Sequence, residues 1–432
     1  MTKIAIITFG CSLNQSDSET MLSLLKESDY QITQDQQEAD LIIINSCTVK
    51  HLAEKKLFKT IENLQAQGKK LVIAGCVAQA HQEYLSSTLK HLSVIGTKQL
   101  QNIAHIVEET LNGNIIHAID MDCDKRLCIP IIRRNPVVGI VPLSEGCLGN
   151  CTYCKTRQAR GPLISYNPKA IKQRVEADLQ SGCKEIWLTS QDCGAYGLDI
   201  DTNIITLLKS ILEIKGDHKI RLGMSNPNHI LQFLDPLIDI YKNHATEQGN
   251  LFCFLHIPIQ SADNQILKAM NRKYTVEEFT HIVTSFRKAI PNITIATDII
   301  VGFPGEAKQQ FESSLQLIQD LNFDVMNISR FWSRPNTPAA SLPNQIHGRD
   351  SKERSQIIKK AKDQSAAKRN QLWKDWQGKI LIDEQGPTGG FIGRNYSYKP
   401  ITIPEANLGD SLIVTVQGPE AHFLKGKIVT KQ

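Results

Sequence analysis

Short apolar runs alternate with amphipathic stretches along most of this chain. In the first part the runs are KIAIITFGC, DLIIINSCTV and KKLVIAGC, and each predicts a buried strand that carries a cysteine at or near its end. Helical segments separate them, and Ser16 and Glu19 fit a capping box in the first of these. The alternation predicts an open parallel α/β sheet over residues 1–115, followed by a linker at residues 116–135.

The alternation continues through residues 136–345 with six more apolar runs: PVVGIVPL, KEIWLTS, KIRLGMS, LFCFLHI, ITIATDIIVG and FDVMNISRF. Six strands with helices between them predict parallel βα units. Six units are too few to close an eight-unit barrel, so we expect a partial (βα)6 barrel. Ligands of such folds bind at the carboxyl ends of the strands.

The carboxyl-terminal part divides into a basic segment and a glycine-punctuated one. Residues 346–372 predict a helical connector, and the stretch from Arg349 to Lys374 holds nine Lys or Arg against three Asp or Glu. Such a helix is either a solvated charged face or an RNA contact. Residues 373–432 predict about five short strands in a small β-barrel. The expected fold class is therefore α/β with an added barrel.

Composition indicates the cellular compartment of the protein and the classes of partner it is expected to lack. The 432 residues contain no run of 18 apolar residues, so neither a membrane helix nor a membrane partner is expected. The start MTKIAIITFGC predicts a first strand and not a secretion signal, which favours the cytoplasm. Eleven cysteines in a reducing compartment indicate metal or redox chemistry more than disulfides. The net charge of +5 is mild, and no DNA partner is expected.

The stretch GCLGNCTYCKTRQARG places Cys147, Cys151 and Cys154 in a C-x3-C-x2-C pattern. A 4Fe–4S cluster normally takes four thiolates, so three would leave one iron open to another ligand. Two alternatives are a zinc site with a distant fourth ligand and three buried apolar thiols.

With Tyr153 before the last cysteine, the pattern resembles the radical S-adenosylmethionine superfamily. The resemblance implies that the open iron binds the amino and carboxylate groups of S-adenosylmethionine, and that cleavage of this cofactor gives a radical that abstracts hydrogen from a C–H bond. It also implies cofactor contacts at the strand ends, where any single polar residue could equally be a helix cap or a satisfied loop group. The residues expected to contact the cofactor are Tyr153, Gln191, Asp192, Ser225, His256, Gln260, Thr297 and Asp298.

Cys11, Cys47 and Cys76 follow successive predicted strands of the amino-terminal sheet. The ends of parallel strands lie along one edge, so these thiols can meet and hold a second 4Fe–4S cluster with its own open iron. Any one of them alone would be a buried apolar cysteine.

Two three-cysteine sites, together with TFGCSLNQSDSE, HIPIQSADNQILKAMNRKYT, TDIIVGFPGE and SRPNTPAA, resemble the methylthiotransferases over essentially the whole chain. One departure is Asn336, where many members have glycine. The resemblance implies replacement of C–H by C–SCH3 with two S-adenosylmethionine molecules per product. It also implies that the second cluster faces the mouth of the central barrel, and that a flavodoxin or ferredoxin type of protein donates electrons.

The substrate is indicated by CKTRQARG and LTSQDCGAYGLDIDTN, which resemble the archaeal and eukaryotic threonylcarbamoyladenosine branch. That branch implies tRNA as the partner and C2 of the adenosine 3′ of the anticodon as the target. Isopentenyladenosine in tRNA and a ribosomal-protein aspartate are the alternatives with the same chemistry. An iron–sulfur RNA-binding protein without turnover is the alternative of another class.

Three basic residues after the cysteine loop could meet substrate: Lys155, Arg157 and Arg160, of which Arg160 is the preferred one and the other two are more simply surface charges. The terminal barrel resembles the TRAM domain of RNA-modifying enzymes. There Arg394 and Tyr396 are expected to contact RNA, with Phe391, Tyr398 and Lys399 interleaved. Five cysteines receive no ligand role: Cys123, Cys128, Cys183, Cys193 and Cys253, the last being most simply core.

Overall fold

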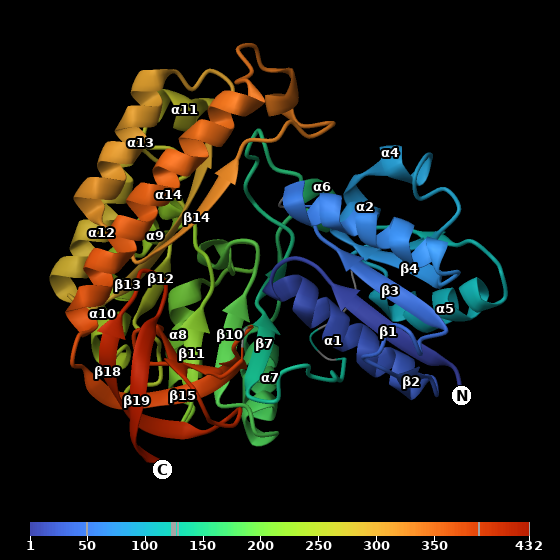
Figure 1. The fold of residues 1–432 in the computed structure, drawn as a ribbon, viewed down its shortest axis with the longest axis horizontal. Coiled ribbons are helices and arrows are strands. Elements are labelled where there is room, and N and C mark those ends of the chain that lie inside the picture. Colours follow the sequence, from blue (N-terminus) through green and yellow to red (C-terminus); the bar gives the residue numbers. More distant parts are fainter. Residues whose placement is uncertain (49–50, 122–126, 128, 388, 432) are drawn as a thin grey trace.

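The computed structural model describes residues 1–48, 51–121, 127, 129–387 and 389–431 (Figure 1). Cys123 and Cys128 lie outside these ranges. Within them, every helix is too short or too polar to traverse a lipid bilayer. The fold is mixed α/β with parallel sheets and a closed terminal barrel, as the sequence predicts.

The amino-terminal domain is a parallel sheet with strand order β2-β1-β3-β4-β5-β6. The strands are β1 (Lys3–Thr8), β2 (Gln31–Ile32), β3 (Leu41–Ser46), β4 (Lys70–Gly75), β5 (Ser93–Ile95) and β6 (His117–Ala118). The helices are α1 (Ser12–Glu27), α2 (His51–Ala66), α3 (Cys76–Ala80), α4 (Gln82–Leu85) and α5 (Ile103–Leu111), with a 3₁₀ turn at Leu100–Asn102. Strand β3 is buried along its whole length, because helices cover both faces of the parallel sheet.

The first helix begins earlier than its sequence suggests. The N-cap of α1 is Cys11, three residues after β1, so the predicted capping box of Ser16 and Glu19 is wrong. Both residues lie inside the helix and are buried. Glu19 faces the linker, where its Oε1 accepts a hydrogen bond from Arg134 N at 3.2 Å.

Burial raises the pKa of Glu19 from 4.5 to about 7. Because the folded-state pKa lies above the ordinary value, the stability held by protonated Glu19 is lost as pH rises from about 4.5 through about 7. Glu19→Gln stays neutral, so we expect it to raise the free energy of unfolding by about 1–3 kcal/mol at pH 8 and by almost nothing at pH 4.5. Urea unfolding at both pH values checks this.

Glu27→Gln, an exposed change on the same helix, is the control. The prediction would be contradicted if the free energy of unfolding changed with pH in the same way in Glu19→Gln and in the unchanged chain.

Six parallel strands form the central domain, in two sheets of order β11-β10-β7 and β12-β13-β14. They are β7 (Val138–Pro142), β10 (Glu185–Thr189), β11 (Lys219–Leu222), β12 (Phe254–His256), β13 (Thr294–Val301) and β14 (Val325–Arg330). A bridge from Ile220 to Leu251 links the two sheets, which gives the predicted partial barrel. A short ribbon, β8 (Ser144–Glu145) with β9 (Ile164–Ser165), lies beside it.

Helices cover the outside of this barrel and share one large apolar core with its strands. They are α7 (Pro168–Gln180), α8 (Ile204–Leu212), α9 (Pro227–Gln232), α10 (Leu234–His244), α11 (Asn264–Ala269), α12 (Val276–Ala289) and α13 (Lys308–Leu321). Helix α6 (Thr156–Arg160) lies apart from this core, and its Ala159 packs with Cys76 and Ala80 of the amino-terminal domain. Short 3₁₀ turns lie at Cys193–Ala195 and Pro338–Ser341. Cys253 is part of the core, as expected.

A long helix, α14 (Gly348–Asn370), leads through a 3₁₀ turn at Gln371–Trp373 to the small barrel. Part of its predicted positive charge is already paired, since Arg354 lies 2.6 Å from Glu306 and Arg369 lies 3.0 Å from Asp324. The small barrel is closed in the order β15-β16-β17-β19-β18. Its strands are β15 (Gln377–Gln385), β16 (Phe391–Arg394), β17 (Pro400–Ile403), β18 (Ser411–Pro419) and β19 (Leu424–Lys431).

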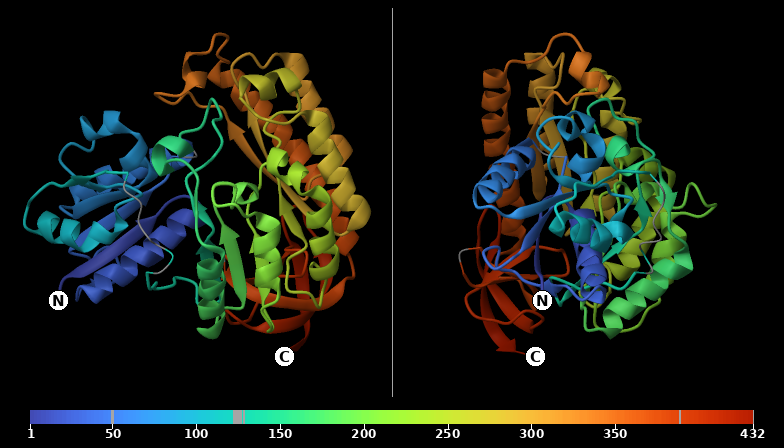
Figure 2. Two further views of the ribbon diagram at one scale, coloured as in Figure 1. Left: turned by 180° about the vertical axis from the view of Figure 1, so that it is seen from behind. Right: turned by 90° about the vertical axis from the view of Figure 1, so that its right-hand side faces the viewer.

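The small barrel docks at the amino ends of the central strands (Figures 1 and 2). Lys184, just before β10, donates to Gly409 O at 2.6 Å, and Asp217, just before β11, pairs with Lys379 at 2.6 Å. The Arg221 guanidinium lies 5.0 Å from the ring centroid of Tyr398 and 5.0 Å from that of Trp187. The barrel therefore covers the end of the central domain that is opposite to the ligand-binding end.

Two residues predicted to contact RNA already have partners within the protein. Arg394 pairs with Asp383 at 3.2 Å and with Glu384 at 2.8 Å. Tyr396 packs its ring on Trp373 with 5.6 Å between centroids, and its hydroxyl accepts a hydrogen bond from Asn292. Both side chains therefore have contacts within the barrel or with the central domain, and their contact with RNA stays a prediction.

Lys399 is buried at the same interface, where its Nζ lies 2.8 Å from Asp324 and 2.9 Å from Asn370 Oδ1. We expect Lys399→Met to lower the free energy of unfolding by about 3 kcal/mol, because it removes one partner from a buried ion pair. Lys425→Met, at an exposed pair in the same barrel, should cost less than about 0.5 kcal/mol. Urea unfolding measures both. A fall in tRNA affinity for Lys399→Met with unchanged stability would contradict the structural role.

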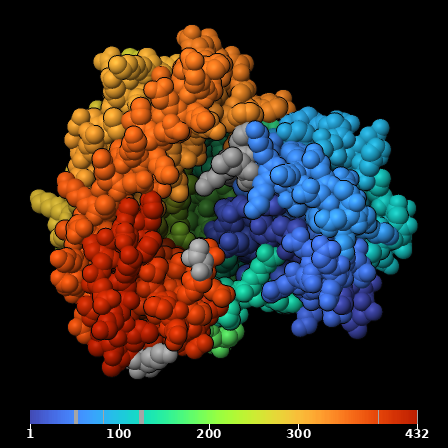
Figure 3. All heavy atoms as spheres, in the orientation of Figure 1, coloured from blue at the N-terminus to red at the C-terminus, as the bar shows by residue number. Residues whose placement is uncertain are grey.

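The two larger domains and the small barrel enclose a hollow. In Figure 3 the surface is recessed between the amino-terminal domain in blue and the α14 and barrel side in orange and red. Figure 2 shows that α6 lies between the amino-terminal sheet and the central strands. The segment that carries Cys147, Cys151 and Cys154 directly precedes α6 and therefore lies where the two domains meet.

Candidate active site

The cysteine loop, residues 147–154, connects β8 to α6 at the carboxyl end of the central strands. Gly146 has φ +69°, and a Cβ there would lie 1.8 Å from Pro162 O, so this position requires glycine. Cys147 N then donates to Gly161 O at 3.2 Å, which closes the loop at its base. On the far side Thr152 N donates to Met270 O at 3.1 Å. The backbone of the loop is thus fixed on both sides.

The three sulfurs of this loop have polar neighbours. Gly149 N donates to Cys147 Sγ at 3.3 Å, and Thr156 N donates to Cys154 Sγ at 3.4 Å. Arg272 Nη1 donates to Cys151 Sγ at 3.2 Å. Burial raises the pKa of the Cys147 thiol to about 12, and it also raises the pKa of Cys154. Buried thiols of this kind become thiolates when a metal supplies the compensating positive charge.

The other three cysteines meet at one edge of the amino-terminal sheet. Cys11 follows β1, Cys47 follows β3 and Cys76 follows β4, and these strands are neighbours. Asn14 Oδ1 lies 3.6 Å from Cys11 Sγ and 3.8 Å from Cys76 Sγ. A Cβ at Gly10 would lie 3.0 Å from Cys47 Sγ, so the backbone before Cys11 approaches that sulfur closely. Residues that are 65 positions apart in sequence therefore share one site.

Contacts across the domain boundary bring the two sites together. Ser12 Oγ, next to Cys11, lies 2.6 Å from Thr189 Oγ1 at the end of β10. Lys155, next to Cys154, donates from Nζ to Ala80 O at 3.2 Å and pairs with Glu83 at 3.3 Å. The cysteine-bearing edge of the amino-terminal sheet thus faces the carboxyl ends of the central strands.

Each site offers three cysteine thiols, the ligands that iron–sulfur clusters take. Among the described residues, no three His, Cys, Asp or Glu side chains are grouped closely enough to ligate one metal ion. A single zinc needs its thiolates within about 4 Å of one another, since each Zn–S bond is about 2.3 Å. A cluster with one thiolate on each iron needs them farther apart. A Cβ at Gly149 would lie 3.4 Å from Cys147 Sγ and 3.9 Å from Cys151 Sγ, so glycine keeps the space beside both sulfurs open.

Of the residues predicted to contact the cofactor, Asp192 is already fully engaged. Its carboxylate accepts hydrogen bonds from Gly194 N at 3.1 Å and from Asn226 N at 3.0 Å, and it lies 2.8 Å from His229 Nδ1. Despite burial, these partners lower the pKa of Asp192. The observed contacts favour a positioning role for Asp192, while its neighbour Gln191 is partly buried at the end of β10.

Ser225 and His256 lie at neighbouring strand ends. Ser225 is 1% exposed, and its Oγ has no hydrogen-bond partner in the described part of the chain. A buried hydroxyl without a protein partner fits a site that a polar ligand completes. His256 ends β12, and its Nε2 lies 3.1 Å from Asp298 Oδ2.

Thr297 and Asp298 do not follow a strand as predicted, because β13 continues to Val301 and they lie inside it. Thr297 is buried and its Oγ1 accepts a hydrogen bond from Ile259 N at 3.1 Å. Gln260 has φ +67° and donates from its backbone N to Asp298 O at 2.8 Å. Tyr153 meets the ring of Phe303 edge-on, with 6.4 Å between centroids.

The basic residues after the cysteine loop differ from expectation. Arg160 is fully buried, 2.6 Å from Asp17 and 3.4 Å from Glu145. It is therefore not available to a tRNA phosphate, because its charge is enclosed at the domain interface. Lys155 is also buried and not the surface charge expected of it. Arg157 is exposed.

Sequence reasoning missed Arg272 and Asn14 as neighbours of the cysteines. Arg272 also donates from Nη2 to Asn226 Oδ1, which connects the cysteine loop to the end of β11. It lies 121 positions from Cys151, and no local pattern relates them. Asn14 lies three residues after Cys11, on the first turn of α1, and this position was the signal that could have predicted its contact with the cysteines.

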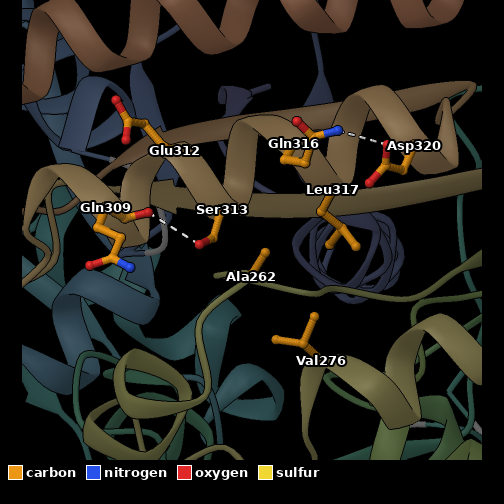
Figure 4. Close-up of a pocket in the computed structure, with 8 residues that line it drawn as sticks. All are labelled: Ala262, Val276, Gln309, Glu312, Ser313, Gln316, Leu317 and Asp320. Atoms are coloured by element: carbon orange, nitrogen blue, oxygen red, sulfur yellow. Dashed lines mark hydrogen bonds between the residues drawn. The ribbon is translucent and has the colours of Figure 1, made fainter.

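An outer groove has no part in this site. It lies along α13 and is lined by Ala262, Val276, Gln309, Glu312, Ser313, Gln316, Leu317 and Asp320 (Figure 4). Its polar groups bond within the helix, as Gln316 does to Asp320 at 2.8 Å. It holds neither cysteine site nor any of the strand-end residues described above.

Comparisons with known proteins show the family of the chain. Residues 3–96 match the family described as Uncharacterized protein family UPF0004, and residues 141–318 match the Radical SAM superfamily. The chain is 38% identical over 434 residues to the probable threonylcarbamoyladenosine tRNA methylthiotransferase of Pyrococcus horikoshii, and covers 100% of both chains. It is 38% identical to the threonylcarbamoyladenosine tRNA methylthiotransferase of Homo sapiens, covering 99% of this chain and 74% of that one.

A solved structure shares the fold. It is the radical S-adenosylmethionine methyltransferase TsrM from Kitasatospora setae with cobalamin and a 4Fe–4S cluster bound, with a TM-score of 0.54 and 13% identity. The match covers 79% of this chain and 77% of that one. At this identity the likeness concerns the fold alone.

Proposed function

This chain belongs to the threonylcarbamoyladenosine tRNA methylthiotransferases of the radical S-adenosylmethionine superfamily, and we propose that it converts N6-threonylcarbamoyladenosine next to the anticodon of tRNA to its 2-methylthio derivative. The observation that carries the proposal is the meeting of two three-cysteine sites across one domain interface. A carbon-activating site and a sulfur-delivering site must lie close together for such a transfer, because the reacting groups have to be positioned against each other away from water.

We assign Cys147, Cys151 and Cys154 to the 4Fe–4S cluster that binds S-adenosylmethionine, and the other three cysteines to a second 4Fe–4S cluster. The chemistry that these groups supply is one-electron activation of a C–H bond and transfer of a methylthio group. The protein holds the thiols in rigid loops, and the unpartnered Ser225 hydroxyl supports a cofactor site at the ends of β10 and β11. Two S-adenosylmethionine molecules per product and a flavodoxin or ferredoxin type of electron donor complete the proposal, in the cytoplasm.

The test is nucleoside analysis by mass spectrometry of tRNA incubated anaerobically with the iron-reconstituted protein, S-adenosylmethionine and a reductant. We expect 2-methylthio-N6-threonylcarbamoyladenosine in tRNA that carries the unmodified precursor. Modification of isopentenyladenosine instead, or of a ribosomal-protein aspartate, would move the chain to another branch. Absence of 5′-deoxyadenosine would reject catalysis and favour an iron–sulfur RNA-binding protein.

A further inference from the structure

A buried polar network connects the amino-terminal three-cysteine site to α6 of the central domain. Asn14 Oδ1, close to the sulfurs of Cys11 and Cys76, also accepts a hydrogen bond from Arg160 Nη2 at 3.0 Å. Arg160 ends α6, the helix that directly follows the cysteine loop of the central domain. One guanidinium from the central domain therefore reaches into the site of the amino-terminal domain.

Two carboxylates hold this guanidinium in place. Nη2 lies 2.6 Å from Asp17 Oδ2 and Nη1 lies 3.4 Å from Glu145 Oε2. Arg160 is 0% exposed, so water does not screen its charge. The bonds through Asn14 place Nη2 within about 7 Å of both sulfurs, a distance at which a buried charge acts strongly.

We propose that Arg160 is a positioning residue for the amino-terminal cluster, placing a fixed positive charge beside the ligands Cys11 and Cys76 and raising the reduction potential of that cluster. This inference rests on the proposed function, because it needs iron bound by these cysteines. Reduction adds one electron to a cluster that already carries thiolate charge, so a nearby cation stabilises the reduced form more than the oxidised form. Asp17 and Glu145 fix the fork of the guanidinium and so fix its distance from the sulfurs.

The experiment uses the full chain with Cys147, Cys151 and Cys154 replaced by alanine, so that only the amino-terminal cluster is present. The reduced fraction of that cluster is measured by EPR during a redox titration. Arg160→Gln should lower the ratio of reduced to oxidised cluster about tenfold at a fixed potential, which is about 59 mV for one electron. Asp17→Asn removes a negative charge from the same network and should shift the ratio in the opposite direction.

Arg157→Gln is the matched control, since it removes an exposed charge from the same helix. It should change the ratio less than about twofold. An unmoved potential in Arg160→Gln, or an equal shift in Arg157→Gln, would overturn the inference. If Arg160→Gln does not fold, Asp17→Asn decides, and an unchanged ratio there overturns it as well. If the chain with Cys147, Cys151 and Cys154 replaced by alanine binds no iron, both the second cluster and the role of Arg160 are rejected. If it binds iron but Arg160→Gln leaves the reduction potential unchanged, only the role of Arg160 is rejected.

Discussion

Cys151→Ala is expected to abolish both cleavage of S-adenosylmethionine and methylthiolation of tRNA, with a loss of more than about 100-fold in each. The Cys151 sulfur is one of three that the loop offers, and Arg272 holds it at 3.2 Å. With two thiols left, the loop no longer binds a four-iron cluster with one open iron. Formation of 5′-deoxyadenosine and of the methylthio nucleoside, measured by mass spectrometry, checks both losses.

The iron content of Cys151→Ala is a second measurement that checks the loss of the cluster. Two four-iron clusters give about eight irons per chain, and Cys151→Ala should retain about four. Cys253→Ala is the control, because this cysteine lies in the apolar core of the same domain and should leave both activities and the iron unchanged. Cleavage of S-adenosylmethionine by Cys151→Ala at the unmodified rate would remove the loop from the catalytic assignment.

Cys76→Ala should separate the two activities. We expect methylthiolation to disappear while 5′-deoxyadenosine still forms, because Cys76 belongs to the amino-terminal site and the loop around Cys151 keeps all of its thiols. Iron should again fall to about four per chain. The measurement is the ratio of the methylthio nucleoside to 5′-deoxyadenosine in one reaction.

Cys183→Ala serves as the control for this variant, since Cys183 is buried in the central core. Its product ratio should match that of the unchanged chain. Loss of both activities in Cys76→Ala would mean that the amino-terminal site supports cofactor cleavage itself. Retention of methylthiolation would remove Cys76 from the second cluster.

Local sequence pattern predicted β1, β3 and β4 of the amino-terminal sheet and the six strands of the central domain, but not the short strands β2, β5 and β6. Periodicity predicts which face of an element is buried, and cysteines at successive strand ends of a parallel sheet must share an edge. The same reasoning failed for Thr297 and Asp298, because the pattern does not mark where β13 ends. In the small barrel, alternating aromatic and basic residues predict a contact surface, but the pattern does not show that Arg394 pairs with Asp383 and Glu384.

The sequence by itself determined the two sets of three cysteines, the α/β class and the family, because each depends on spacing or on identity along the chain. The tertiary structure alone decided the roles of the charged residues around them. Arg160 meets Asn14 from 146 positions away, and Lys399 meets Asp324 from 75 positions away. Which charge a buried group faces depends on how separate domains pack, and a local pattern carries no information about that packing.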